Sequence, residues 1–177
     1  MKRVASILLA VVLAAALLLN MALQASAQAT RVEVASYEYD CFTGVDKVWA
    51  EGQVQHIRNI YHTNIDVSDS PELNGINTTV ADAEFNLITG TITIRGTMSF
   101  EPYEIDGTWE GTWFYVNNNG VIKGQAVARG TGTLSGKTLF LDLYDTPYNP
   151  ETEVMCEGIG LPEGNIVIEG YILDSGG

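Results

Sequence analysis

Side chains that bind transition metals are scarce in this sequence. It holds two histidines, His56 and His62, and two cysteines, Cys41 and Cys156. Zinc and similar ions are held by three or four such ligands, and the two cysteines are expected to bond to each other. The composition therefore predicts no metal centre, and no motif indicates another cofactor.

Positive charge is also scarce. The chain has nine Lys and Arg against 22 Asp and Glu, and two of the nine, Lys2 and Arg3, stand at its start. The remainder keeps seven basic residues and a formal charge of −15. Such a field repels phosphate backbones and anionic lipid surfaces, which argues against nucleic acid as a partner. We interpret the acidity as a source of solubility outside the cell.

Sequence signatures of catalysis are missing as well. There is no G-x-S-x-G, and the acidic loop with Asp66, Asp69 and Glu72 does not have EF-hand spacing. Carboxylates in the loops 101–106 and 145–153 could hydrolyse glycosides only if two of them converged, and nothing in the sequence brings them together. Whether the protein is an enzyme stays open, and a non-enzymatic role is favoured.

The first 27 residues have the pattern of an export signal. A basic start precedes the apolar run Ile7–Leu19 and the small-x-small pattern at 25–27 that signal peptidase cleaves. We expect a signal peptide at 1–27 and one domain at 28–177, secreted to an extracellular or periplasmic compartment without stable membrane insertion. An uncleaved anchor is the alternative, but the apolar run is short for a span of roughly 20 residues.

The two cysteines predict a disulfide. An even cysteine count in an exported chain is typical of a bonded pair. Cys41 and Cys156 lie near opposite ends of the mature sequence, so a bridge would close a very long loop. The chain-entropy model gives such a loop roughly 4–5 kcal/mol, less any strain. Two unpaired, buried cysteines are the alternative.

Eight short β-rich runs follow the leader, separated by turn residues, and no clear amphipathic helix interrupts them. This pattern is typical of a sandwich or a barrel. The predicted strands cover 31–40, 54–67, 77–88, 91–100, 108–116, 121–129, 137–144 and 165–173. The clearest hairpin turn is 117–120, because asparagine and glycine accept the positive φ that such turns require.

Side-chain alternation gives several of these strands one apolar face. The residues concerned are Ile92, Ile94, Met98, Phe100, Leu139, Leu141, Leu143, Ile166, Ile168 and Ile172. One apolar face per strand indicates an antiparallel sheet with one wet side, and the short links indicate a meander.

Glycines inside the strands support closure of the meander, because they mark bends, bulges or close approaches. They are Gly96, Gly107, Gly111, Gly124, Gly130, Gly132 and Gly170. We therefore predict an all-β fold, a single antiparallel meander β-barrel of about eight strands. A sandwich of the same strands is the alternative.

The most unusual stretch is DGTWEGTWFYV at 106–116, in which Gly-Thr-Trp occurs twice. Alternation places Trp109, Trp113 and Tyr115 on one face, with Gly111 between the two indoles. Two indoles that flank a glycine leave a slot in which an apolar or planar ligand could bind. The alternative is that the tryptophans fill the barrel core.

The segment 54–62 carries polar residues on both alternating faces. His56, Arg58 and His62 share one of them, so a half-buried strand would turn some polar groups inward, where they need partners. His56 and Arg58 together could bind a carboxylate or steady an oxyanion. An exposed edge of the barrel explains the same pattern without a ligand.

Four stretches between Val54 and Leu173 carry a resemblance to known barrels. They are HIR at 56–58, GTWEGTW at 107–113, GVIKGQAVARGTGTLSG at 120–136 and KTLFLDLYD at 137–145. They resemble small secreted, calycin-like bacterial proteins of the allene oxide cyclase and dirigent type. The resemblance implies an eight-stranded barrel with a central hydrophobic cavity, often oligomeric. Plant members guide cyclisation or coupling of apolar intermediates mostly by cavity shape, and no catalytic residues carry over to this chain.

These patterns lead to three functional hypotheses. The first is a secreted barrel that binds a small, largely apolar ligand, or an exported interaction module. In it, Trp109, Trp113 and Tyr115 form the cavity wall, and His56 and Arg58 form a polar anchor. The second is a cyclase or isomerase that works by confinement, and the third is a structural envelope or surface protein. A homo-oligomer is compatible with each.

Overall fold

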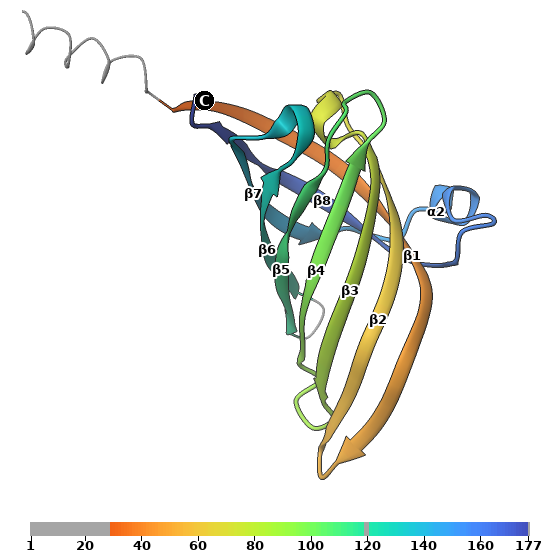
Figure 1. Cartoon of the computed structure of the whole chain (residues 1–177). Helices are drawn as coiled ribbons and strands as arrows, with labels where there is room; N and C mark the ends of the chain where they lie inside the picture. Colours follow the sequence, from red (N-terminus) through yellow and green to blue (C-terminus); the bar gives the residue numbers. More distant parts are fainter. Residues whose placement is uncertain (1–28, 119–120, 177) are drawn as a thin grey trace, which may run out of the picture.

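The structure, a computed structural model, describes residues 29–118 and 121–176. Eight antiparallel strands form one closed barrel, as the sequence predicts (Figure 1). The predicted signal peptide and the tip of the predicted turn at 117–120 lie outside the described residues.

The strands follow one another around the barrel in sequence order. They are β1 (Thr30–Glu51), β2 (Val54–Val67), β3 (Gly75–Asn86), β4 (Ile92–Pro102), β5 (Trp109–Asn118), β6 (Val121–Gly130), β7 (Lys137–Asp145) and β8 (Leu161–Asp174). The links contain the 3-10 turns η1 (Pro71–Leu73) and η2 (Gly132–Leu134) and the short helix α2 (Glu151–Met155). Within this part of the chain, no helix has the length and apolar character needed to cross a membrane.

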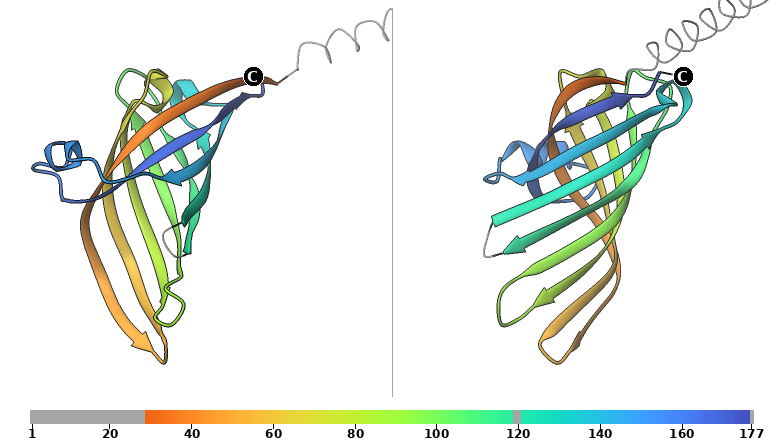
Figure 2. Two further views of the ribbon diagram at one scale, coloured as in Figure 1. Left: turned by 180° about the vertical axis from the view of Figure 1, so that it is seen from behind. Right: turned by 90° about the vertical axis from the view of Figure 1, so that its left-hand side faces the viewer.

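Closure depends on β1, which pairs with two neighbours. Its first half pairs with β8, from Thr30↔Asp174 to Phe42↔Leu161, and its second half pairs with β2 as far as Glu51↔Val54. The sheet is therefore continuous around the barrel, which excludes the sandwich. β1 extends well past its predicted end at residue 40, and the β1–β2 hairpin projects beyond the other strands (Figures 1 and 2).

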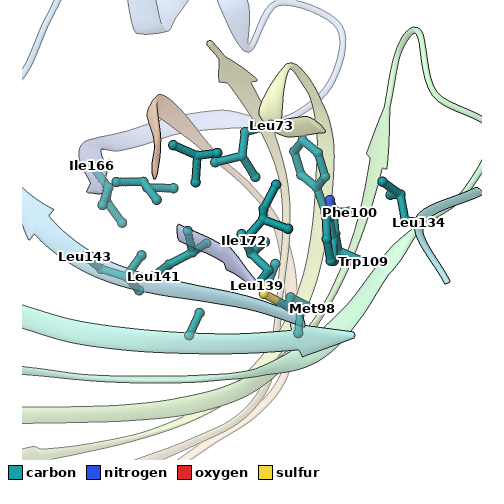
Figure 3. Close-up of a cluster of buried hydrophobic side chains, with 14 residues drawn as sticks. Leu73, Met98, Phe100, Trp109, Leu134, Leu139, Leu141, Leu143, Ile166 and Ile172 are labelled. Carbon is teal, nitrogen blue, oxygen red and sulfur yellow. The ribbon is translucent and has the colours of Figure 1, made fainter. Parts of the chain in front are cut away.

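One end of the barrel is filled by an apolar plug (Figure 3). We define it by the buried side chains Leu73, Phe100, Trp109, Leu134, Leu139 and Ile172. Leu73 comes from η1 and Leu134 from η2, so the two turns close this end. The alternation predicted for the strands at 91–100, 137–144 and 165–173 is confirmed, because their apolar residues share the interior face.

The link between β7 and β8 is fastened to the outside of β1. Cys41 and Cys156 form the predicted disulfide, with Cα atoms 5.4 Å apart and a sequence separation of 115. The hydroxyl of Tyr39 also donates to Glu151 Oε2 at 3.0 Å. The link that carries α2 is therefore attached to the outer face of β1.

Candidate functional site

A cavity of about 220 Å³ lies inside the barrel, next to the apolar plug. Its lining divides into two walls. The apolar wall consists of Ile60, Ile94, Met98, Trp113, Tyr115, Ala126, Leu141, Leu143, Ile166 and Ile168. The polar wall consists of Glu38, Asp40, His62, Asn64, Asn77, Thr79, Asp145, Glu163 and Asn165.

Two stacked rings dominate the apolar wall. The ring centroids of Trp113 and Tyr115 are 5.6 Å apart and their planes differ by 21°. Neighbouring strands leave room for these rings, because a Cβ at Gly96 would lie 2.9 Å from Trp113 Nε1 and one at Gly124 would lie 2.5 Å from Tyr115 Cβ. The indole Nε1 of Trp113 donates to the carbonyl oxygen of Thr97 at 3.3 Å. The rings of Trp113 and Tyr115 are thus held in fixed positions beside the cavity.

Trp109 has a different position from Trp113. It is fully buried in the apolar plug, where its Nε1 donates to the carbonyl oxygen of Glu72 at 3.0 Å, and it does not line the cavity. Gly111 leaves no open slot between the indoles, because a Cβ there would lie 2.6 Å from the Cβ of Ala128 on β6. The predicted slot is therefore occupied by the adjacent strand.

His56 and Arg58 lie on the outer face of the barrel, and neither lines the cavity. The ring of His56 stacks on Trp49 with centroids 5.0 Å apart. Arg58 Nη1 lies 3.5 Å from Asp82 Oδ2, and His56 Nδ1 lies 3.6 Å from Glu84 Oε1. The structure does not bring these two residues to the aromatic wall, so the polar anchor expected from them is absent from the cavity.

A bulge in β2 explains this placement. Ile57 pairs with Ala83 and Ile60 pairs with Ala81, so the register against β3 shifts between them. Asn59 adopts a positive φ of 52° at this point. The shift breaks the alternation, and His62 therefore points into the cavity although His56 and Arg58 point outward.

The polar groups that do face the interior come from β1, β2, β3, β7 and β8, and β1 contributes two carboxyl groups, those of Glu38 and Asp40. Glu38 is buried and accepts a hydrogen bond from Asn77 Nδ2 at 2.9 Å. Behind it, Asp66 is also buried and accepts a hydrogen bond from Ser36 Oγ at 2.7 Å. Asp40 extends the row along the same face of β1 and lines the cavity.

Sequence reasoning missed Glu38 and Asp40 because, between residues 35 and 41, the opposite face of β1 is the more apolar one. Tyr37, Tyr39 and Cys41 lie on that face, and it is covered from outside by the α2 link. The predicted disulfide could have indicated the inward orientation of Glu38 and Asp40. A cysteine bonded to a residue in a link outside the barrel must point outward, which turns Glu38 and Asp40 inward.

The acids that line the cavity, and the buried Asp66 beside them, influence one another's pKa values. Burial raises the pKa of Asp40 well above its ordinary value, and the nearby Glu38, Glu163 and Asp145 raise it further. Burial also raises the pKa of Asp66, Glu38 adds to the effect, and the hydrogen bond from Ser36 opposes it. Both carboxyl groups therefore hold a proton more readily than a carboxyl group in water does.

Burial, followed by the charges of the same group of acids, raises the pKa of Tyr115. Its phenol therefore stays protonated and is able to donate a hydrogen bond.

On the opposite side of the cavity, His62 Nε2 lies 2.6 Å from Glu163 Oε2. The side chain of Glu163 is 57% exposed, so this pair lies where the cavity meets solvent.

The site offers a ligand aromatic rings on one side and carboxyl, amide and hydroxyl groups on the other. Among the described residues, no group of three or more His, Cys, Asp and Glu side chains is arranged to hold a metal ion. No protein-family model, curated protein or solved structure matches the chain.

Proposed function

We propose that this protein binds a small, largely apolar ligand in the barrel cavity. The observation that carries the proposal is the stacked pair Trp113 and Tyr115, which borders about 220 Å³ of space. Large aromatic side chains usually fill a core, as Trp109 does here. Cavities lined by aromatic and aliphatic groups with a few polar groups are typical of small-molecule sites.

The cavity volume limits the size of the ligand. A cavity of about 150 Å³ in another protein accommodates benzene. A volume of about 220 Å³ therefore suits one ring with a short side chain.

Export forms part of the proposal. The Cys41–Cys156 disulfide supports it, because such bonds persist in oxidising compartments such as the periplasm and the cell exterior. The pattern at 1–27 supports it independently through a cleavable leader. The protein would then meet its ligand outside the cytoplasm.

Removal of the larger ring tests the binding function. Trp113→Ala should weaken the binding of a neutral probe, 2-phenylethanol, by at least about 2 kcal/mol, which is roughly thirtyfold in Kd, because aromatic anchors carry much of the energy of such sites. Isothermal titration calorimetry measures the change. Native mass spectrometry of the purified protein shows in parallel whether a natural compound co-purifies.

Trp49→Ala is the matched control, because Trp49 lies on the outer face against His56. It should leave the affinity for 2-phenylethanol unchanged. Equal affinities of the two variants would contradict binding in the cavity.

An enzyme of the cyclase or isomerase kind is a second candidate, and one observation favours it. Asp40 lines the barrel cavity and its pKa is raised, and a raised pKa is a common property of catalytic acids. A protonated carboxyl group at this position could protonate a confined, reactive intermediate. In that case Asp40→Asn should abolish turnover and keep the fold.

A further inference from the structure

Three strands contribute carboxyl groups to the polar wall. Glu38 and Asp40 belong to β1, Asp145 to the end of β7 and Glu163 to β8. Among the lining residues, positive charge is available only from His62, whose Nε2 contacts Glu163 at 2.6 Å. None of the described lysines and arginines lines the cavity. Glu38, Asp40 and Asp145 therefore face it without a basic partner.

Asn77 of β3 adds an acceptor that lacks a donor. Its side chain lines the cavity and the residue is only 7% exposed. Its Nδ2 donates to Glu38 Oε2 at 2.9 Å, which fixes the orientation of the amide. The other end, Oδ1, is buried and has no hydrogen-bond partner. Buried acceptors of this kind are rare in folded proteins, so Asn77 indicates, independently of the acids, that a donor belongs here.

We propose that the ligand carries an organic ammonium group. This group would donate hydrogen bonds to Asn77 Oδ1 and to the carboxylates of Glu38 and Asp40, and the apolar part of the ligand would lie against Trp113 and Tyr115. The inference rests on the proposed function, because it names the chemical class of the molecule bound in the same cavity.

An ammonium group meets each requirement of this wall. Its hydrogens provide up to three donors on one centre, and its charge balances carboxylates that have no basic partner. The faces of aromatic rings also attract cations, and Trp113 and Tyr115 supply two of them. A neutral alcohol would supply a donor but would leave the negative charge of the wall uncompensated.

A metal ion fits the same wall less well. Calcium needs six to eight oxygen ligands and magnesium needs near-octahedral geometry, and the described side chains form no such cluster.

The test compares three ligands of similar shape and different charge. The probes are 2-phenylethylamine, which is an ammonium ion at neutral pH, the neutral 2-phenylethanol and the anion 3-phenylpropanoate. Each is titrated calorimetrically into the disulfide-bonded protein. We expect the ammonium ion to bind at least about tenfold more tightly than the alcohol, because hydrogen bonds to charged groups are the stronger ones. The anion should bind more weakly than both.

Two variants locate the preference. Asp40→Asn keeps the shape of the side chain and removes its charge, so it should bring the Kd of the ammonium ion to within about threefold of the Kd that the alcohol has for the same variant. Asp142→Asn removes the same charge from the outer face of β7, where Asp142 accepts a hydrogen bond from Gln125 Nε2 at 3.0 Å. It should change neither Kd. Thermal melts verify that both variants fold.

Each other outcome has a distinct meaning. Equal binding of the ammonium ion and the alcohol would overturn the ammonium inference and leave the proposed function standing. Equal losses in Asp40→Asn and Asp142→Asn would also overturn it, because the preference would then come from the overall negative charge. Binding of none of the three probes would contradict the proposed function itself.

Discussion

At the scale of single residues, the aromatic wall depends on Gly124. A Cβ at this position would lie 2.5 Å from Tyr115 Cβ and 2.7 Å from the carbonyl oxygen of Phe114. Backbone atoms of a paired strand cannot withdraw without loss of the ladder. Gly124→Ala should therefore destabilise the protein by about 1–3 kcal/mol, as measured by urea unfolding.

Gly44→Ala is the control for this substitution. Its added Cβ would meet its nearest neighbour, Tyr61 Cδ2, only at 3.9 Å. The stability should change by less than about 0.5 kcal/mol. If both glycine variants unfolded at the same urea concentration, the close approach of Tyr115 to β6 would make no contribution to the free energy of unfolding.

The direction of side chains could be predicted from the sequence in β5 but not in β2. The ladders of β5 are regular, so simple alternation places Trp113 and Tyr115 on the interior face correctly. In β2, the bulge at Asn59 is stabilised by its own contacts: its backbone N–H donates to Asp82 Oδ1 and its Nδ2 donates to Asp46 Oδ2. Asparagine tolerates a positive φ, but a single sequence does not say which polar residue forms a bulge.

At the scale of elements, β1 is the least predictable strand. The bounds of β2 match the predicted 54–67, and the other strands differ from prediction mostly at their ends. In β1, the second half projects beyond the barrel with β2, and its side chains are largely exposed on both faces. A strand that is exposed to solvent on both faces shows no alternation of apolar and polar residues, so its extent cannot be predicted from that pattern. The first half has alternation, but between residues 35 and 41 its more apolar face is outward.

The disulfide between β1 and the α2 link gives a prediction at the same scale. A variant with both Cys41→Ser and Cys156→Ser should lose up to about 4–5 kcal/mol, because the bond closes a loop of about 115 residues. Urea unfolding of the oxidised protein and the variant measures the difference.

The link should keep part of its structure in that variant. Asn165 Nδ2 donates to Thr152 Oγ1 at 2.7 Å, and Asn165 Oδ1 accepts from the backbone N–H of Asn149 at 2.8 Å. Hydrogen exchange should therefore quicken in 145–160 while the barrel strands stay protected. A loss of stability below about 1 kcal/mol would show that barrel closure alone fixes the ends of this loop.

At the scale of the whole molecule, the buried acids link stability to pH. The pKa values of Asp40 and Asp66 are raised above the ordinary 3.8, so the folded protein binds these protons more tightly than the unfolded chain does. Their stabilising contribution is fully present below pH 3.8 and is lost as the pH rises through the raised values. The melting temperature of the ligand-free protein should fall as the pH rises from about 4 toward neutrality.

Asp66→Asn should flatten this dependence. The amide cannot ionise, its oxygen can still accept the hydrogen bond from Ser36, and its nitrogen can donate toward Glu38. Asp69→Asn removes a charge from the exposed loop nearby and serves as the control. Melting curves across the pH range compare the two, and a slope in Asp66→Asn as steep as that of the control would contradict the assignment.

The pairing of β1 with β8 also determines when folding can be completed. Each hairpin from β2 to β7 joins neighbours in the sequence, but closure joins Thr30 to Asp174. Contacts between distant segments form slowly, because the chain loses its freedom before it gains them. Until β8 is in place, the first half of β1 offers an unpaired edge on which a second chain could add a strand. The pairing of β1 with β8 is therefore both the slow step of folding and the step at which aggregation is most favoured. The Cys41–Cys156 bond lies beside this pair of strands.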